Sequence, residues 1–194
     1  MEIKGVKILG VGGIGGALAA PLCRYLQYTV NSDEPITITL IDGDKYERKN
    51  LDRQNCAWGD LNTNKAQAEL EKLQAEFGTL DIEVYPSYIT PMNIDSVIKD
   101  GDVVFCGVDN HKTRKVLADY AKTLDNIVII SGGNEMTDGG VQIFIKKDGK
   151  RITANLDEYH PEIADPKDKS PDEVGCAEMA PSAPQLYFMN MQVA

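Results

Sequence analysis

The chain alternates between two kinds of segment along most of its length. Short runs rich in β-branched residues are each followed by a longer segment with helical periodicity. Strands are predicted at 6–12, 35–42, 82–89, 102–109 and 126–133, and helices at 15–28, 64–77, 93–101 and 111–124. Repeated strand–helix alternation favours parallel strands with helices on both faces of the sheet. The sequence therefore predicts an α/β fold with a Rossmann-like, doubly wound, mostly parallel sheet.

The remainder of the chain departs from this alternation. The stretch "GVQIFIKKDGKRI" predicts an antiparallel edge hairpin that turns at "KDGK". Residues 153–183 are polar, contain several prolines and lack a clear period, so we expect a long crossover loop. An apolar helix is predicted from 184 to 194, and we expect the chain to be truncated inside it. One domain is predicted, with its main body in residues 1–152.

Charge and cysteine content exclude several classes of function. The formal net charge is −10, which argues against nucleic acid or an anionic membrane as the main partner. No apolar stretch is long enough to span a bilayer. Cys23, Cys56, Cys106 and Cys176 form no CxxC pair, and only two histidines accompany them, so no zinc site is expected. Scattered cysteines are typical of the reducing cytoplasm.

A glycine-rich turn joins the first predicted strand to the first predicted helix. The motif "GVGGIG" places Gly10, Gly12, Gly13 and Gly15 at the spacing G-x-G-x-x-G. Glycines let a backbone approach phosphates, and a helix N-terminus offers N–H groups to them. Asp42 ends the second strand, where a carboxylate can accept hydrogen bonds from ribose hydroxyls. These features predict a nucleotide site and are also compatible with a nicotinamide-dependent dehydrogenase.

Two cations beyond Asp42 favour a triphosphate over a dinucleotide. Arg53 can clamp phosphate oxygens in pairs, and Lys65 supplies a point charge at the start of a helix. Asp109 ends the fourth predicted strand, at the sheet edge where ligands bind in open α/β folds, and is a plausible Mg²⁺ ligand. A dehydrogenase would also need a substrate domain, for which 194 residues leave little space.

The strings "GVGGIG", "IDGDKYERKNLDRQ" and "GVDN" together resemble the ubiquitin-activating-enzyme-like superfamily of the ThiF/MoeB type. The resemblance implies a cytoplasmic, homodimeric enzyme that uses ATP to adenylate the C-terminal glycine of a ubiquitin-like or sulfur-carrier protein. It assigns the nucleotide to Gly10, Gly12, Gly13, Gly15, Asp42, Asn50, Arg53, Gln54, Lys65 and Asp109. Among these, Arg53, Lys65 and Asp109 would be catalytic, and Asp109 would hold Mg²⁺. Cys176, in the crossover loop, would receive the activated acyl group as a thioester.

Three features of such relatives are not recognised here, namely an arginine-bearing helix before the first strand, two CxxC zinc pairs and the C-terminal strands. Because the arginine-bearing helix is not recognised, we expect each ATP site to be complete within one chain. A bacterial ubiquitin-like conjugation pathway, with a conjugating enzyme as a further partner, is favoured over sulfur-carrier activation for thiamine or molybdopterin synthesis. A non-catalytic half of a heterodimer is the third alternative, although such halves usually lose Asp42, Arg53, Lys65 and Asp109.

Overall fold

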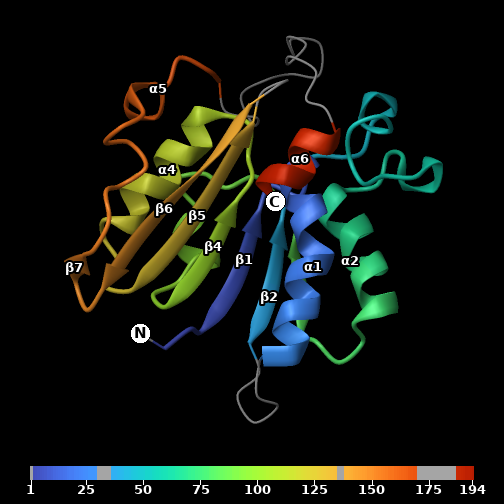
Figure 1. Ribbon diagram of the computed structural model, residues 1–194, viewed down its shortest axis with the longest axis horizontal. Coiled ribbons are helices and arrows are strands. Elements are labelled where there is room, and N and C mark those ends of the chain that lie inside the picture. The colour runs from blue at the N-terminus through green and yellow to red at the C-terminus, as the bar shows by residue number, and fades with distance from the viewer. Residues whose placement is uncertain (1, 30–35, 135–137, 170–186) are drawn as a thin grey trace.

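The computed structural model describes residues 2–29, 36–134, 138–169 and 187–194. Its strands form one seven-stranded sheet in the order β3-β2-β1-β4-β5-β6-β7 (Figure 1). The strands are β1 (Gly5–Leu9), β2 (Thr37–Ile41), β3 (Ile82–Tyr85), β4 (Asp102–Cys106), β5 (Ile127–Asn134), β6 (Gly139–Lys147) and β7 (Lys150–Arg151). The first five are parallel, and β6 and β7 pair antiparallel at one edge. The predicted fold class is confirmed.

Helices lie on both faces of the sheet. They are α1 (Gly13–Thr29), α2 (Lys65–Glu76), α3 (Ile94–Val97), α4 (His111–Ala121), α5 (Pro161–Ala164) and α6 (Tyr187–Val193), with 3-10 turns at Arg48–Asn50 and Trp58–Asp60. One core packs α1 and α2 against β1 and β2, and a second core packs α3, α4 and α5 against β4 and β5. None of the helices in the described ranges has the length and apolar composition needed to cross a membrane.

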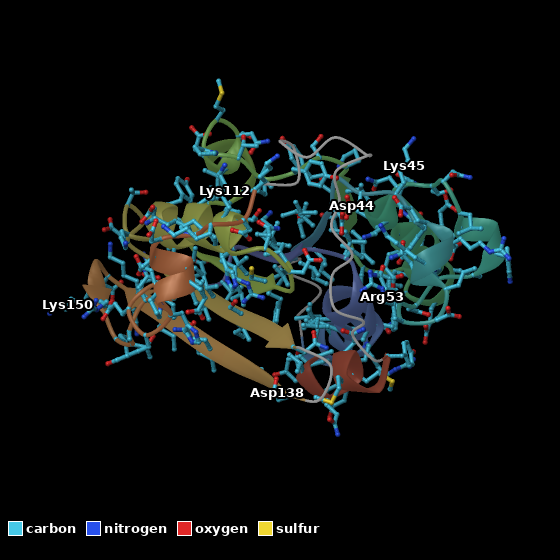
Figure 2. The ribbon with its side chains drawn as sticks, turned by 90° about the horizontal axis from the view of Figure 1, so that it is seen from above. Asp44, Lys45, Arg53, Lys112, Asp138 and Lys150 are labelled. Atoms are coloured by element: carbon cyan, nitrogen blue, oxygen red, sulfur yellow. The ribbon has the colours of Figure 1, made fainter. Side chains whose placement is uncertain are left out.

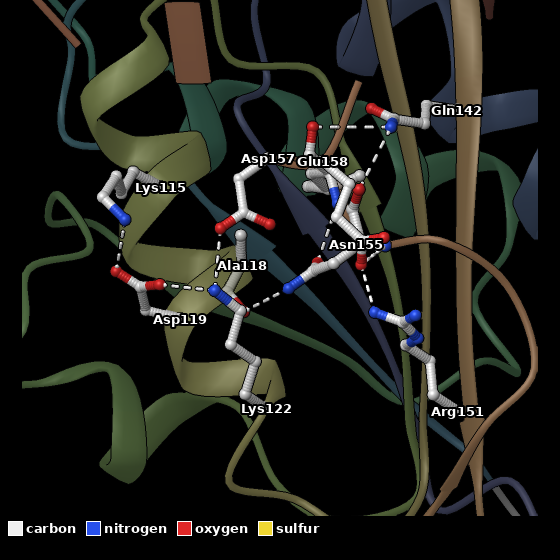
Figure 3. A network of polar contacts seen from close by, with 10 residues as sticks. Lys115, Ala118, Asp119, Lys122, Gln142, Arg151, Asn155, Asp157 and Glu158 are labelled. Atoms are coloured by element: carbon white, nitrogen blue, oxygen red, sulfur yellow. Dashed lines mark hydrogen bonds and ion pairs between the residues drawn. The ribbon is translucent and has the colours of Figure 1, made fainter. Parts of the chain in front are cut away.

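The segment after the β6–β7 hairpin is folded back onto α4. Leu156 and Ile163 belong to the core around α4, and the Asn155 amide donates to the carbonyl of Ala118 at 3.0 Å. Figure 3 shows this network, in which Lys122 also pairs with Asp157 at 2.7 Å. The first part of the predicted crossover loop is thus anchored, so that it reaches the carboxyl ends of the strands. The part of that loop that contains Cys176 lies outside the described residues.

The face of the sheet that carries α1 and α2 is only partly covered. Beyond β1, this face continues across β4, β5 and β6 (Figure 1). The registers of these strands place apolar residues beside one another in rows. One row is Val103, Val128 and Ile145, the next is Phe105, Ile130 and Ile143, and Val141 begins a third opposite Gly132. Val141 is 53% exposed and Ile143 48% exposed, and no helix of the described ranges buries them. This side of β4–β6 is therefore an apolar surface, called here the open sheet face.

The strand order places a crevice between β1 and β4. The chain leaves β1 for α1 on one face of the sheet and leaves β4 for α4 on the other, so the two connections diverge. Their starts remain close, because Gly107 N–H donates to the carbonyl of Leu9 at 2.8 Å. In open α/β sheets, ligands bind at the carboxyl ends of the strands at this change of direction.

Candidate functional site

A cleft of about 890 Å³ opens at this point, along the carboxyl ends of the strands. Figure 2 shows Asp44 and Arg53 on the side of α2, Lys112 on the side of α4, and Asp138 at the tip of β6 close to α6. Eight of the predicted site residues line the cleft: Gly10, Gly12, Gly13, Asp42, Arg53, Gln54, Lys65 and Asp109. Gly15 and Asn50 do not line it. The structure thus brings together residues that are as far apart in the sequence as Gly10 and Asp109.

The glycine turn, residues 10–15, contains glycines that packing within the protein requires. Gly10 has φ +86°, and a Cβ there would lie 2.9 Å from the backbone nitrogen of Val108. A Cβ on Gly15 would overlap the carbonyl oxygen of Gly10. These two glycines therefore allow β1, α1 and the loop after β4 to meet. A Cβ on Gly12 would make only ordinary contact, 3.6 Å from the Gln54 amide nitrogen, so Gly12 faces the cleft.

Asp42 is a buried carboxylate that helps to fix the glycine turn. Its carboxylate accepts hydrogen bonds from the backbone N–H groups of Val11 at 2.7 Å and Asp44 at 2.8 Å. The residue is 9% exposed. Burial raises the pKa of Asp42 to about 6, although the positive charge of Lys65 and both N–H donors act in the opposite direction. Asp42 is therefore near its titration point under mildly acidic conditions.

Lys65 is placed in the cleft by the start of α2. Asn64 caps this helix by accepting from Gln67 N–H at 3.1 Å, and its own amide donates to the carbonyl of Asp42 at 2.8 Å. This arrangement ties the start of α2 to the end of β2. The Lys65 ammonium then lies 3.0 Å from a carboxylate oxygen of Asp44.

Lys65, Asp42 and Asp44 form one electrostatic group. Burial by itself would lower the pKa of Lys65, which is 7% exposed, but the charges of Asp42 and Asp44 raise it overall. Burial would likewise raise the pKa of Asp44, but Lys65 and a hydrogen bond from the Tyr88 hydroxyl lower it overall. The cleft therefore holds a buried, charged ammonium group beside two carboxylates, a polar wall suited to a charged ligand.

The loop before α2 presents Arg53 and Gln54 to the cleft. Asn50 shapes this loop: it is 2% exposed, its side-chain oxygen accepts from Glu47 N–H at 2.8 Å, and its carbonyl accepts from Gln54 N–H at 2.9 Å. The side-chain oxygen Oε1 of Gln54 is buried and has no hydrogen-bond partner among the described residues. Because buried acceptors are normally satisfied, this atom fits a donor on a bound ligand.

Asp109 follows β4 and is exposed at the cleft, where its charge contributes to the raised pKa of Lys65. Within the described ranges, no three His, Cys, Asp or Glu side chains form a metal-binding group. Mg²⁺ in nucleotide sites usually takes one or two carboxylates and completes its shell with phosphates and water. An exposed carboxylate at this position therefore fits a Mg²⁺ that is bound together with phosphates.

Arg114 lines the cleft, but its contacts show a structural role. Its guanidinium donates to the Ser131 hydroxyl at 2.7 Å and to the carbonyls of Gly132 at 2.8 Å and Val108 at 2.6 Å. The residue is 9% exposed and ties α4 to the end of β5.

Two residues of the site had no role assigned from the sequence. Asp44 lies in the D-x-D motif after β2, so the motif could have indicated it. Tyr88 follows a proline in a short loop, with no sequence signal that it would reach Asp44.

The fold and the cleft define a nucleotide-binding α/β protein of the doubly wound type, and comparison with known families makes this more specific. Residues 3–185 match the model of the ThiF family. The chain belongs to the ThiF family.

Relatives with assigned names agree with this family. The adenylyltransferase and sulfurtransferase UBA4 of Yarrowia lipolytica is 27% identical over 144 residues, which are 74% of this chain and 35% of that protein. The probable adenylyltransferase/sulfurtransferase MoeZ of Mycobacterium tuberculosis is 25% identical over 166 residues, 85% of this chain and 41% of that protein. The chain therefore spans well under half the length of these relatives.

Solved structures agree on the fold. Escherichia coli MccB aligns with a TM-score of 0.71 at 20% identity, over 98% of this chain and 51% of MccB. The E. coli tRNA N6-threonylcarbamoyladenosine dehydratase TcdA, solved in complex with AMP, aligns with a TM-score of 0.59 at 22% identity, over 70% of this chain and 53% of TcdA.

Proposed function

We propose that this protein uses ATP to adenylate the C-terminal glycine carboxylate of a sulfur-carrier or ubiquitin-like protein. The observation that carries the proposal is the buried Lys65 ammonium, which lies in one cleft with Arg53, Asp42 and the glycine turn. Two cations beside a ribose-type carboxylate suit a triphosphate. The names of the UBA4 and MoeZ relatives, which include adenylyltransferase activity, support the reaction class.

In the proposed reaction, a carboxylate oxygen of the carrier attacks the α-phosphorus of ATP. A bond forms between that oxygen and phosphorus, the bond from phosphorus to the bridging α,β-oxygen breaks, and pyrophosphate leaves with the electron pair. No side-chain nucleophile is needed. Arg53 and Lys65 neutralise the charge that develops on the phosphates, Asp42 binds the ribose hydroxyls, and the cleft holds the reactants in line.

Asp109 would hold Mg²⁺ in this site, since it is an exposed carboxylate that follows β4 and lines the cleft. The ion would neutralise phosphate charge when bound. Gln54 Oε1, which has no partner among the described residues, would accept a hydrogen bond from the nucleotide.

The carrier's tail has a path along the other end of the cleft. Gly133, Gly139 and Gly140, at the ends of β5 and β6, line it together with Val141 and Gln142. Gly140 has nothing within 4 Å of the position a Cβ would occupy. An extended glycine-ended peptide needs such open backbone.

ATP–pyrophosphate exchange tests the proposed reaction. We expect exchange that depends on Mg²⁺ and on a carrier protein, and none with the same carrier lacking its terminal glycine. Wild-type protein that binds nicotinamide dinucleotide and catalyses no exchange with any glycine-ended carrier would instead support the dehydrogenase alternative. Where exchange does occur, the fate of the carrier distinguishes the two versions of the function. Sulfur transfer would convert the carrier to a thiocarboxylate, and protein conjugation would give an isopeptide adduct.

Cys176 is proposed as the acceptor of the carrier's acyl group, in the conjugation version of this function. The proposal depends on its place in the polar segment "DEVGCAEMAPSAP" and on the family resemblance. Cys176→Ser should then leave pyrophosphate exchange intact and abolish a thiol-reducible carrier adduct. If wild type forms no such adduct with its carrier and ATP, the reaction stops at the acyl-adenylate.

A homodimer is also proposed, and the open sheet face supports it. A contiguous set of apolar side chains on β4, β5 and β6 is typical of an interaction surface. A two-fold symmetric pairing of two copies is the commonest way to bury such a surface.

A further inference from the structure

Asn190 is a fully buried polar residue on α6, at 0% exposure, and it bonds to two separate parts of the cleft wall. Its side-chain nitrogen Nδ2 donates to the backbone carbonyl of Arg53 at 2.8 Å. Its side-chain oxygen Oδ1 accepts from the Asn134 amide at 3.0 Å. The orientation of the amide is fixed, because a carbonyl can only accept and so must face the nitrogen. One side chain therefore links the Arg53 loop to the end of β5.

Glycines in the wall make room for this link. A Cβ on Gly13 would lie 2.5 Å from Asn190 Cγ, which is closer than real atoms approach. Further along α6, a Cβ on Gly132 would lie 2.9 Å from Val193, and one on Gly139 would overlap Val193. Gly13, which lies between the second and third glycines of the G-x-G-x-x-G motif, is thus covered by Asn190 of α6. It lets the helix lie directly against the start of α1.

We propose that Asn190 is a positioning residue that fixes the Arg53 main chain against the glycine turn and so sets where the Arg53 side chain meets the outer phosphates of ATP. The inference rests on the proposed ATP site. The Asn190 side chain touches the backbone of Arg53 and not the cleft, since Asn190 does not line it. Buried hydrogen bonds at both ends of the amide make the link rigid, because displacing the amide would break both bonds in a buried environment.

A comparison of ATP with AMP isolates this role. AMP has the base, the ribose and the α-phosphate but lacks the outer phosphates that Arg53 is proposed to hold. For Asn190→Ala, we expect the dissociation constant of ATP to rise about tenfold and that of AMP to change less than twofold, both measured by titration calorimetry. Asn190→Ser is a second variant for the case in which the alanine protein does not fold. This variant should also weaken ATP binding more than AMP binding, but by a smaller factor.

Met191→Ala is the matched control, because Met191 is the next residue on α6 and is 54% exposed. It should leave both dissociation constants unchanged. Gly13→Ala provides an independent route, since its Cβ must displace Asn190. The double variant Gly13→Ala/Asn190→Ala should therefore bind ATP no more weakly than the weaker single variant.

The positioning role is wrong if folded Asn190→Ala weakens ATP and AMP equally, or weakens neither. These outcomes differ from failure of the proposed function. Wild type that binds ATP but shows no carrier-dependent exchange would overturn the adenylation proposal, while the comparison of ATP with AMP would still test Asn190.

Discussion

The two halves of the sheet differ in the kind of surface that they present. In the half built on β1, β2 and β3, buried charged groups partner one another: Lys65 pairs with Asp44, and Asp42 accepts from two backbone N–H groups. In the half built on β4, β5 and β6, Arg114 also has its partners, but an apolar face with Val141 and Ile143 stays exposed. The first half has its polar wall ready for a small charged ligand. The second half has apolar surface that another protein surface could bury.

This difference separates what a nucleotide requires from what a protein partner requires. A phosphate group is bound best by cations and N–H donors that are already in place, because rearranging these groups during binding would lower the affinity. Association with a protein partner requires exposed apolar area from which water is displaced when the two surfaces meet. We therefore expect changes in the first half to affect nucleotide chemistry and changes in the second half to affect association.

The largest effect is expected from Lys65→Met. Loss of the ammonium should cost about 2–4 kcal/mol of transition-state stabilisation, on the scale of a lost oxyanion donor. Pyrophosphate exchange should fall by about two orders of magnitude when measured well below the melting temperature. Lys122→Met is the control: it also removes ion pairs, to Asp119 and Asp157, but lies outside the cleft (Figure 3). A full exchange rate in Lys65→Met would remove Lys65 from the proposed reaction.

The next effect concerns association through the open sheet face. Ile143→Asp places a charge in the middle of that face, opposite Ile130. A charge in an apolar interface is strongly unfavourable, so the variant should be monomeric at concentrations where wild type is a dimer by light scattering. Tyr28→Asp, at a 90% exposed position on α1, should leave the dimer intact. A monomeric wild type, or a dimeric Ile143→Asp protein, would mean that the face has another purpose.

The halves also differ in how far the sequence predicted them. The strands were predictable because β-branched runs are bounded by turn residues, and the place of Asp42 followed from its position at the end of a strand. Motif spacing identified the loop with Arg53 but not the direction of each side chain. Asn50 holds the loop together instead of facing the cleft, and Gly15 packs against Gly10.

Features that depend on contacts between distant segments were not predictable. Leu156 and Ile163 are isolated apolar residues in a polar stretch without helical or strand periodicity, so their burial against α4 left no pattern. Asn190 is likewise a polar residue in a mostly apolar helix, and nothing in the sequence marks it as buried. Its two partners come from a loop and a strand more than fifty residues away in the sequence.

A third effect is a pH dependence of nucleoside binding. Asp42 should accept ribose hydroxyls best when ionised, and its pKa is raised to about 6 by burial. Affinity for adenosine, which has no phosphate to titrate, should therefore fall about tenfold from pH 7 to pH 5. Asp42→Asn should bind more weakly at pH 7 and lose most of this dependence. An unchanged affinity for adenosine in wild type between these pH values would argue against Asp42 as the ribose ligand.

The same shift has a consequence for stability with a definite sign. The folded pKa of Asp42 lies above the ordinary aspartate value of 3.8, so the folded state binds more protons than the unfolded state between about pH 4 and pH 6. The contribution of Asp42 to stability therefore falls as the pH rises through this window. Asp42→Asn should remove that decrease in urea unfolding.

The smallest effect is expected from Tyr88→Phe, and its sign is opposite to that of Asp42. The Tyr88 hydroxyl donates to Asp44, whose pKa is lowered below the ordinary aspartate value of 3.8. A carboxylate with a lowered folded pKa stabilises the protein above its unfolded pKa and loses this contribution as the pH falls through the folded value. Because the Asp44 side chain is 33% exposed, we expect Tyr88→Phe to lower the free energy of unfolding by about 0.5–1 kcal/mol at pH 7, and this loss should shrink below about pH 4.

Tyr120→Phe is the matched control, because the Tyr120 hydroxyl donates to the uncharged carbonyl of Ile98 at 3.1 Å. Its cost in urea unfolding should be similar in size but should not follow this pH dependence. Equal losses at all pH values in both variants would show that the hydrogen bond from Tyr88 does not act through the charge of Asp44.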